Sequence, residues 1–178
     1  IQDPQGDQAN NVEQAIQASL QALQVIDHET TPVEWTKAMV SLGNAYQYRV
    51  HGDNAKNIER AIEAYEQALE VMPRKQMSGL QAMVTINLAN AYVIRVHGDR
   101  SENIEKALHH CHYTLQIITR ETMPVEWAKT MVILANVYLY RIHGDRAENI
   151  EQALHHCNQA LQVIDSNNMP NEWAQAVN

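Results

Sequence analysis

The sequence contains no phenylalanine, only two cysteines, and few of the residues that interrupt helices. Six glycines and five prolines among 178 residues are too few for a fibrous or disordered chain. Two cysteines cannot make the disulfide framework of a small secreted domain, so we expect a reducing compartment, the cytoplasm. The longest apolar run, residues 131–140, is interrupted by Asn136 and is too short to cross a bilayer. These absences predict a globular protein that is not inserted in a membrane.

Positive charge is also scarce. Lysine and arginine total 13 against 21 aspartates and glutamates, which gives a net charge of −8. Nucleic acids and anionic membranes both attract proteins through a basic surface, and this composition does not favour one. We therefore expect neither as a partner, and expect a protein or a peptide instead.

What the sequence does contain is an internal repeat. The pair Gly-Asp recurs every 46 residues, and other identities keep the same register without an insertion. The aligned positions are Gly6, Gly52, Gly98 and Gly144; Asn11, Asn57, Asn103 and Asn149; Trp35, Trp127 and Trp173; Tyr46, Tyr92 and Tyr138; Arg49, Arg95 and Arg141; and His51, His97 and His143. Residues 1–178 are thus predicted to form a single array that starts and stops within a repeat, which favours a fragment of a longer protein.

Each repeat is expected to form two helices and no strand. Pro32, Pro124 and Pro170 suit the first turn of a helix, and the apolar residues that follow recur at three- and four-residue steps. The glycine of the Gly-Asp pair can adopt the left-handed conformation that closes a helix. The pattern predicts helices near 8–27, 32–50, 55–73, 77–96, 101–119, 124–142, 147–165 and 170–178. The expected fold class is all-α.

Several repeated side chains are expected to have structural roles. Asn57, Asn103 and Asn149 are predicted to cap the second helix of a repeat. The histidines at 51, 97 and 143 are expected to hydrogen-bond the exposed backbone carbonyls at the end of the first helix. Arg49, Arg95 and Arg141 are expected to pair with Asp53, Asp99 and Asp145 across the loop, with a carboxylate ligand as the alternative. The three tryptophans are expected to pack between repeats.

Part of the repeat resembles the tetratricopeptide consensus. Residues 42–46, Leu-Gly-Asn-Ala-Tyr, match its first helix, and Ala61, Tyr65, Ala68 and Pro73 follow at the spacing of its second helix. The units of that family have about 34 residues, so these are longer, and they resemble arrays in bacterial multidomain proteins, including those joined to caspase-like CHAT peptidases. The resemblance implies a right-handed helical-repeat solenoid of antiparallel helix pairs.

Two histidine-rich stretches, residues 109–112 and 155–157, raise the question of a metal site. His109 and His112 would stand one helical turn apart and could share a zinc ion. The register instead places Cys111 and Cys157 at the buried position of Tyr65, so we interpret both as core residues and expect no metal and no cofactor. No acid–base pair, activated nucleophile or glycine-rich phosphate loop appears, so we assign no catalytic residue and do not expect an enzyme.

The resemblance places a ligand on the concave face, which the first helices would line. The expected peptide-binding residues are Lys37, Val40, Asn44, Gln47 and Tyr48; Met83, Ile86, Asn90, Val93 and Ile94; and Lys129, Val132, Asn136, Leu139 and Tyr140. The three asparagines would read the peptide groups of an extended ligand through their amides. The sequence thus predicts a protein-interaction scaffold. The alternatives are a regulatory arm of a larger enzyme, such as a CHAT-type peptidase, and an assembly module that associates end to end.

Overall fold

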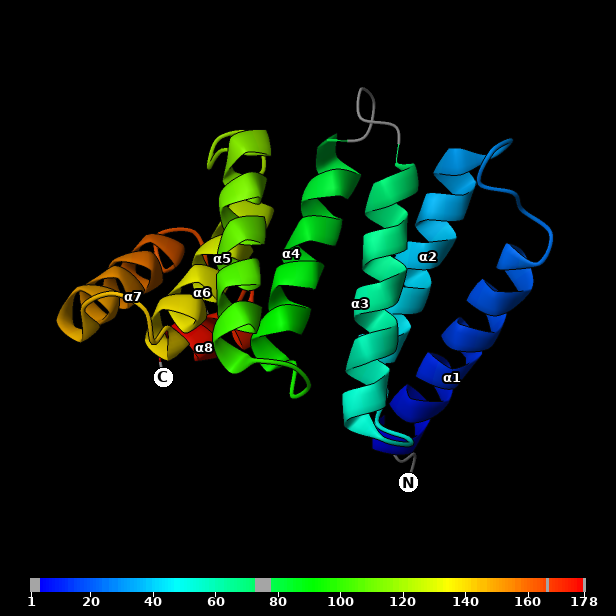
Figure 1. Cartoon of the computed structure of the whole chain (residues 1–178), viewed down its shortest axis with the longest axis horizontal. Helices are drawn as coiled ribbons and strands as arrows, with labels where there is room; N and C mark the ends of the chain where they lie inside the picture. The colour runs from blue at the N-terminus through cyan, green and yellow to red at the C-terminus, as the bar shows by residue number, and fades with distance from the viewer. Residues whose placement is uncertain (1–3, 73–77, 166, 178) are drawn as a thin grey trace. The chain divides into compact units, whose positions relative to one another are not determined.

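The computed structural model describes residues 4–72, 78–165 and 167–177. These residues form α-helices joined by short loops and contain no strand, which confirms the all-α class (Figure 1). The helices are α1 (Pro4–Leu23), α2 (Pro32–Gln47), α3 (Asn54–Val71), α4 (Ser78–Ile94), α5 (Arg100–Ile117), α6 (Pro124–Tyr140), α7 (Arg146–Ala160) and α8 (Pro170–Val177). None of the helices described is long and apolar enough to cross a membrane.

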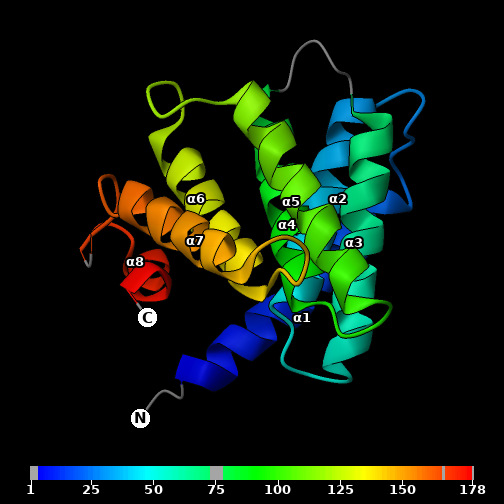
Figure 2. The same cartoon turned by 60° about the vertical axis from the view of Figure 1, so that its left-hand side comes forward.

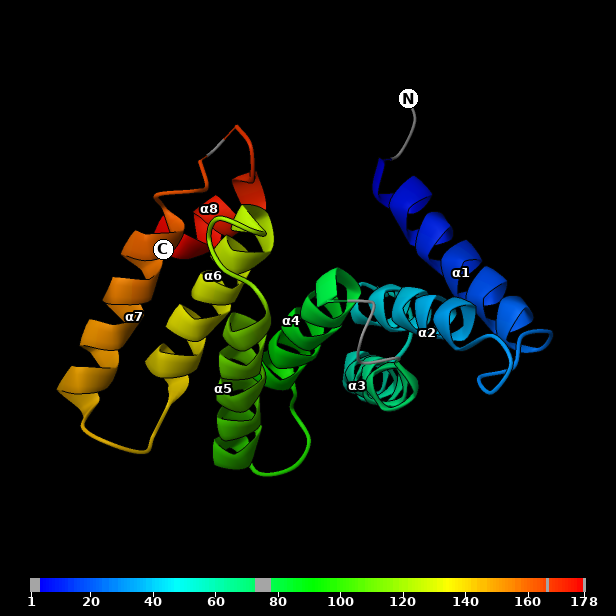
Figure 3. The same cartoon turned by 90° about the horizontal axis from the view of Figure 1, so that it is seen from above.

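The helices divide into two compact bodies, which we describe separately. Of the described residues, the first body comprises 4–72 with 94–96, and the second comprises 78–93, 97–165 and 167–177. In the first body, α2 contacts both α1 and α3 (Figure 3). In the second body, α6 contacts α5, α7 and α8 (Figure 2). The arrangement of all the helices as one continuous array stays a prediction.

The helix boundaries predicted from the sequence are wrong at several C-terminal ends. The helices α2, α4 and α6 end at Gln47, Ile94 and Tyr140 rather than at 50, 96 and 142, and α7 ends at Ala160 rather than at 165. Because the helices end early, the repeated glycines lie in the loops beyond them. Their positive φ angles are 80° at Gly52, 78° at Gly98 and 82° at Gly144. The left-handed conformation therefore turns the loop toward the next helix, and does not close the helix before it.

The helices α3, α5 and α7 are each capped by an aspartate, so the asparagine caps predicted for them are wrong. Asp53, Asp99 and Asp145 accept hydrogen bonds from backbone N–H groups two or three residues further on. Asn57 is instead buried, and its side-chain amide donates to the carbonyl of His51 over 2.9 Å. Asn103 and Asn149 make the equivalent bonds at 2.8 and 2.9 Å. The repeated asparagine thus anchors the loop through the backbone of the histidine, whose side chain is exposed at 51, 97 and 143.

The repeated arginines pair with glutamates, and not with the aspartates predicted for them. Arg49 donates to both carboxylate oxygens of Glu13, at 2.7 and 2.9 Å. The same two-bond arrangement joins Arg95 to Glu59 and Arg141 to Glu105. Each pair links a second helix to the end of the next first helix, 36 residues away in sequence. Arg49 also holds the pKa of Glu13 below its ordinary value through this hydrogen bond.

The size of core residues is matched between facing helices. Tyr65 on α3 is fully buried against Gly43 on α2, where an added Cβ would lie 2.6 Å from Tyr65 Cε1. In the second body the equivalent positions hold Ala89 or Ala135 and a cysteine, which are all small residues. Cys111 is buried, as predicted for a core residue, and burial raises the pKa of its thiol. Cys157 is only half-buried.

The tryptophan contacts that the structure gives are local. The ring of Trp35 lies 5.8 Å from that of His28, and the Trp127 ring lies 5.8 Å from Arg120 Cζ. Trp173 is 37% exposed. Packing of the three tryptophans between repeats stays a prediction.

Candidate functional site

The fifteen side chains predicted to line a groove differ widely in exposure. Those on the surface are Lys37, Tyr48, Met83, Ile94, Leu139 and Tyr140. Those that are half-buried are Asn44, Gln47, Asn90, Lys129 and Asn136. The four β-branched aliphatic residues, Val40, Ile86, Val93 and Val132, are buried. Binding by this set remains a prediction, and any ligand would meet the aromatic, amide and lysine side chains before the valines and the isoleucine at 86.

The first body contains a pocket between α1 and α2, with a volume of about 460 Å³. Four of the predicted residues line it from the α2 side: Lys37, Val40, Asn44 and Tyr48. The other lining residues are Ser41 and Ala45, with Gln8, Asn11, Val12 and Ala15 from α1. A smaller adjoining pocket of about 310 Å³ extends past Val12 and Tyr48 to Val50. The structure thus brings part of the predicted set together into one concave surface.

The α1 side of this pocket was missed by sequence reasoning. The register marks Val12 and Ala15 as apolar core positions of a second helix, because their equivalents in α5 are Ile104 and Ala107. Those equivalents are fully buried, whereas Val12 and Ala15 are only half-buried. The periodicity that identifies an apolar face does not say whether another helix covers it.

The pocket is lined by apolar and amide side chains. Val12 and Val40 are among its apolar residues, and Asn11 and Asn44 bring side-chain amides. Lys37 is the one charged group among the lining residues that the structure describes, and it is exposed. The Arg49–Glu13 ion pair clamps α1 to α2 beside the pocket. Such a site can take an apolar side chain, hydrogen-bond a peptide group and attract a carboxylate.

The three predicted asparagines are not equivalent in the structure. The Tyr65 hydroxyl donates to Asn44 Oδ1 over 2.8 Å, and also lies 3.0 Å from Gln47 Oε1. At Asn90 and Asn136 no hydrogen bond of the side-chain amide is found within the described residues. The reason is visible in the sequence, because the register position of Tyr65 is a cysteine in the two later repeats. Asn90 and Asn136 therefore keep more amide capacity for a ligand than Asn44 does.

The second body has its own pocket, of about 720 Å³, between the end of α5, the start of α6 and α7. Arg120 lines it and is bonded to Gln162 Oε1 over 2.7 Å. His155 and His156 from one histidine-rich stretch also line it. His156 stacks on Tyr138 at 5.5 Å, and burial lowers the pKa of its imidazole. Across residues 4–72, 78–165 and 167–177, no group of histidine, cysteine, aspartate and glutamate is arranged to hold a metal ion.

No family model, curated protein or solved structure matches this chain. The likeness to the tetratricopeptide consensus therefore remains a resemblance of sequence pattern.

Proposed function

We propose that this chain is a protein-interaction module that binds a peptide segment on the face that α2 lines in the first body. The proposal includes a right-handed solenoid like that of the tetratricopeptide family, and action in the cytoplasm, which the low cysteine content favours. The observation that carries it is the α1–α2 pocket, which is lined by four of the residues that the sequence predicts for peptide binding.

The pocket defines the chemistry of the peptide. An apolar side chain of the ligand would rest on the half-buried Val12, where burial removes apolar surface from water. The amide of Asn11 would hydrogen-bond a peptide group beside it, and the exposed ring of Tyr48 would cover it. Lys37 would attract an acidic residue next to the apolar one. The expected ligand is thus a short segment in which an apolar residue adjoins aspartate or glutamate.

A peptide library displayed on phage tests this function with a defined probe. Peptides selected on the wild-type chain should share an apolar residue beside an acidic one. A selected peptide should bind about ten-fold more weakly to Lys37→Glu, because the charge at the pocket is reversed. Lys56→Glu is the matched control, since Lys56 is exposed on α3 and does not line the pocket. Failure to select peptides, or equal weakening by both variants, would contradict the proposed function.

A further inference from the structure

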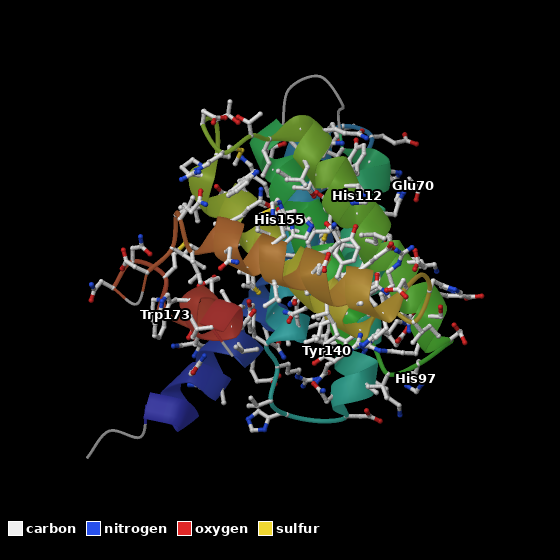
Figure 4. The ribbon with its side chains drawn as sticks, turned by 90° about the vertical axis from the view of Figure 1, so that its left-hand side faces the viewer. Glu70, His97, His112, Tyr140, His155 and Trp173 are labelled. Atoms are coloured by element: carbon white, nitrogen blue, oxygen red, sulfur yellow. The ribbon has the colours of Figure 1, made fainter. Side chains whose placement is uncertain are left out.

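The pocket of the second body is formed by three consecutive helices and the segments that follow two of them. Leu115 and residues 118–121 come from the end of α5 and the loop after it, and Trp127 and Met131 come from α6. The remaining residues come from α7 and the turn after it, among them His155, which Figure 4 labels. The volume of about 720 Å³ lies within the range of about 300–1,000 Å³ that is usual for small-molecule sites. The pocket can therefore hold a small organic ligand.

Arg120 brings to this pocket a positive charge that no carboxylate neutralises among the described residues. Its guanidinium donates to the side-chain oxygen of Gln162 over 2.7 Å and to the backbone carbonyl of the same residue over 3.3 Å. Both acceptors are neutral, and Arg120 makes no ion pair within the described part of the chain. Because a guanidinium has five N–H donors, the Nε–H of Arg120 and two other N–H groups stay without an acceptor there.

The repeat register shows that a carboxylate is also used at the position of Gln162. Glu70 on α3 aligns with Gln162, two repeats of 46 residues away. Glutamate and glutamine have nearly the same shape, so a glutamate at 162 could accept the same hydrogen bond from Arg120 and would neutralise its charge. Glutamine keeps the hydrogen bond without adding a negative charge. The charge of Arg120 is therefore held in place and left for another anion.

Trp127 gives the pocket an apolar contact surface and a further donor. Its ring lies 5.8 Å from Arg120 Cζ, which is a cation–π distance. The indole is half-buried, and its N–H has no acceptor among the residues that the structure describes. Leu115, which is also half-buried, adds an apolar side chain. A ligand could therefore bury an apolar ring against Leu115 and Trp127 while its charged end binds Arg120.

The other titratable groups of the pocket limit the charge of the ligand. Glu121 lines the pocket, and a hydrogen bond from the Thr119 hydroxyl lowers the pKa of its carboxyl group, which is ionised at neutral pH. Burial lowers the pKa of the His156 imidazole, which is uncharged at neutral pH. A ligand thus meets one arginine and one carboxylate. This balance favours an anion with a single charge over a phosphate, which carries nearly two.

We propose that this pocket binds a small carboxylate that carries an apolar ring. The carboxylate would accept hydrogen bonds from the N–H groups of Arg120 that Gln162 leaves unused, and such charge-assisted bonds are strong. The ring would contact Trp127 and Leu115. The site is separate from the α1–α2 pocket of the proposed function, because that pocket lies in the first body. Either proposal can therefore fail while the other stands.

The ligand 2-naphthoate is a suitable probe, and 2-naphthamide is its uncharged counterpart of nearly the same shape. In NMR spectra of the whole ¹⁵N-labelled chain, naphthoate should shift the indole N–H signal of Trp127, which Trp127→Phe assigns. The signals of Trp35 and Trp173 should stay in place, since neither residue lines the pocket. The amide should bind about ten-fold more weakly. No saturable shift up to about 10 mM naphthoate, or equal binding of the amide, would overturn the proposal. Tighter binding of 2-naphthyl phosphate would overturn the assignment to carboxylates.

Two substitutions remove the free positive charge in different ways. Arg120→Gln deletes it, and Gln162→Glu neutralises it while the hydrogen bond to Arg120 is kept, so each should weaken naphthoate binding about ten-fold. A purely structural role of Arg120 would leave binding by Gln162→Glu unchanged. Arg60→Gln is the matched control, since Arg60 is exposed on α3 and does not line the pocket. Unchanged binding by Gln162→Glu, or equal weakening by Lys37→Gln in the α1–α2 pocket, would overturn the proposal.

Discussion

The helices α5 and α7 show that a repeat fixes which face of a helix is apolar, but not whether that face is buried. Their central residues are nearly identical, and each is capped by an aspartate and anchored by a buried asparagine. They differ in what lies against their first turns. The end of α6 covers α5 with an ion pair and an arginine–tyrosine contact, and α7 has no counterpart of it among the described residues. Equal sequences therefore contribute unequally to stability, according to their neighbours.

The largest expected change in stability comes from replacing the two equivalent isoleucines of α5 and α7 with alanine. Ile104→Ala should lower the free energy of unfolding by about 2–5 kcal/mol, because it leaves a cavity in a fully buried site. Ile150→Ala should change it by only about 0.5 kcal/mol, since the side chain is partly in water already. Urea denaturation of the two variants measures the difference. Equal losses would show that α7 is covered in solution.

The next largest change in stability is expected in the first body, where Tyr65 occupies the position that Cys111 has in the following repeat. Gly43→Ala should destabilise the chain by about 1–3 kcal/mol, because the added methyl group would press on the Tyr65 ring. The same substitution combined with Tyr65→Cys should cost less than the sum of the two single changes, since alanine faces cysteine in the later repeats. Thermal melts of the two single variants and the double variant give the coupling. Strict additivity would contradict the size-matching account.

A smaller change in stability should distinguish Asn44 from Asn90, two asparagines among the predicted peptide-binding residues. Asn44→Ala should cost about 1–2 kcal/mol of stability, because the buried Tyr65 hydroxyl loses an acceptor. Asn90→Ala should leave the melt nearly unchanged, since its side chain has no hydrogen bond within the described residues. If Asn90 reads a peptide group, the same variant should weaken a selected peptide by about 1–3 kcal/mol. A large loss of thermal stability in Asn90→Ala, with peptide binding unchanged, would show that Asn90 has a structural role and does not bind the peptide.

The smallest expected effect concerns protonation of α7. Burial lowers the pKa of His156 below its ordinary value of 6.5, although a hydrogen bond to Gln159 acts in the opposite direction. The unfolded chain therefore binds this proton first as pH decreases, so stability should fall from about pH 6.5 down through the pKa of the folded state. Melting temperatures measured between pH 7.5 and 5.5 should drop less steeply for His156→Gln than for the wild type. Identical slopes would mean that the imidazole is as well solvated as in the unfolded chain.

The sequence was sufficient to predict the eight helices found in the described residues and their order, because apolar periodicity and proline positions are local signals. It was not sufficient to predict the partners of long side chains. Arg49 has Asp53 near it in sequence, but the fold brings Glu13 to it, and Asp53 caps a helix instead. Only the α2 side of the pocket could be predicted, because its residues follow the repeat pattern of the first helices. Val12 lines it from α1, where the repeat pattern marks only a core position.

The measurement that tests the central claim most directly is an NMR titration of the isotopically labelled chain with a peptide selected from the phage library. The side-chain amide signals of Asn11 and Asn44 report on the α1–α2 pocket without interference from the backbone. If the chain binds peptides as proposed, these signals and the backbone amides of Lys37 and Tyr48 should shift in proportion to occupancy. Shifts confined to the second-body pocket around Arg120 and His155, with Asn11 and Asn44 unmoved, would contradict the assignment of the binding face.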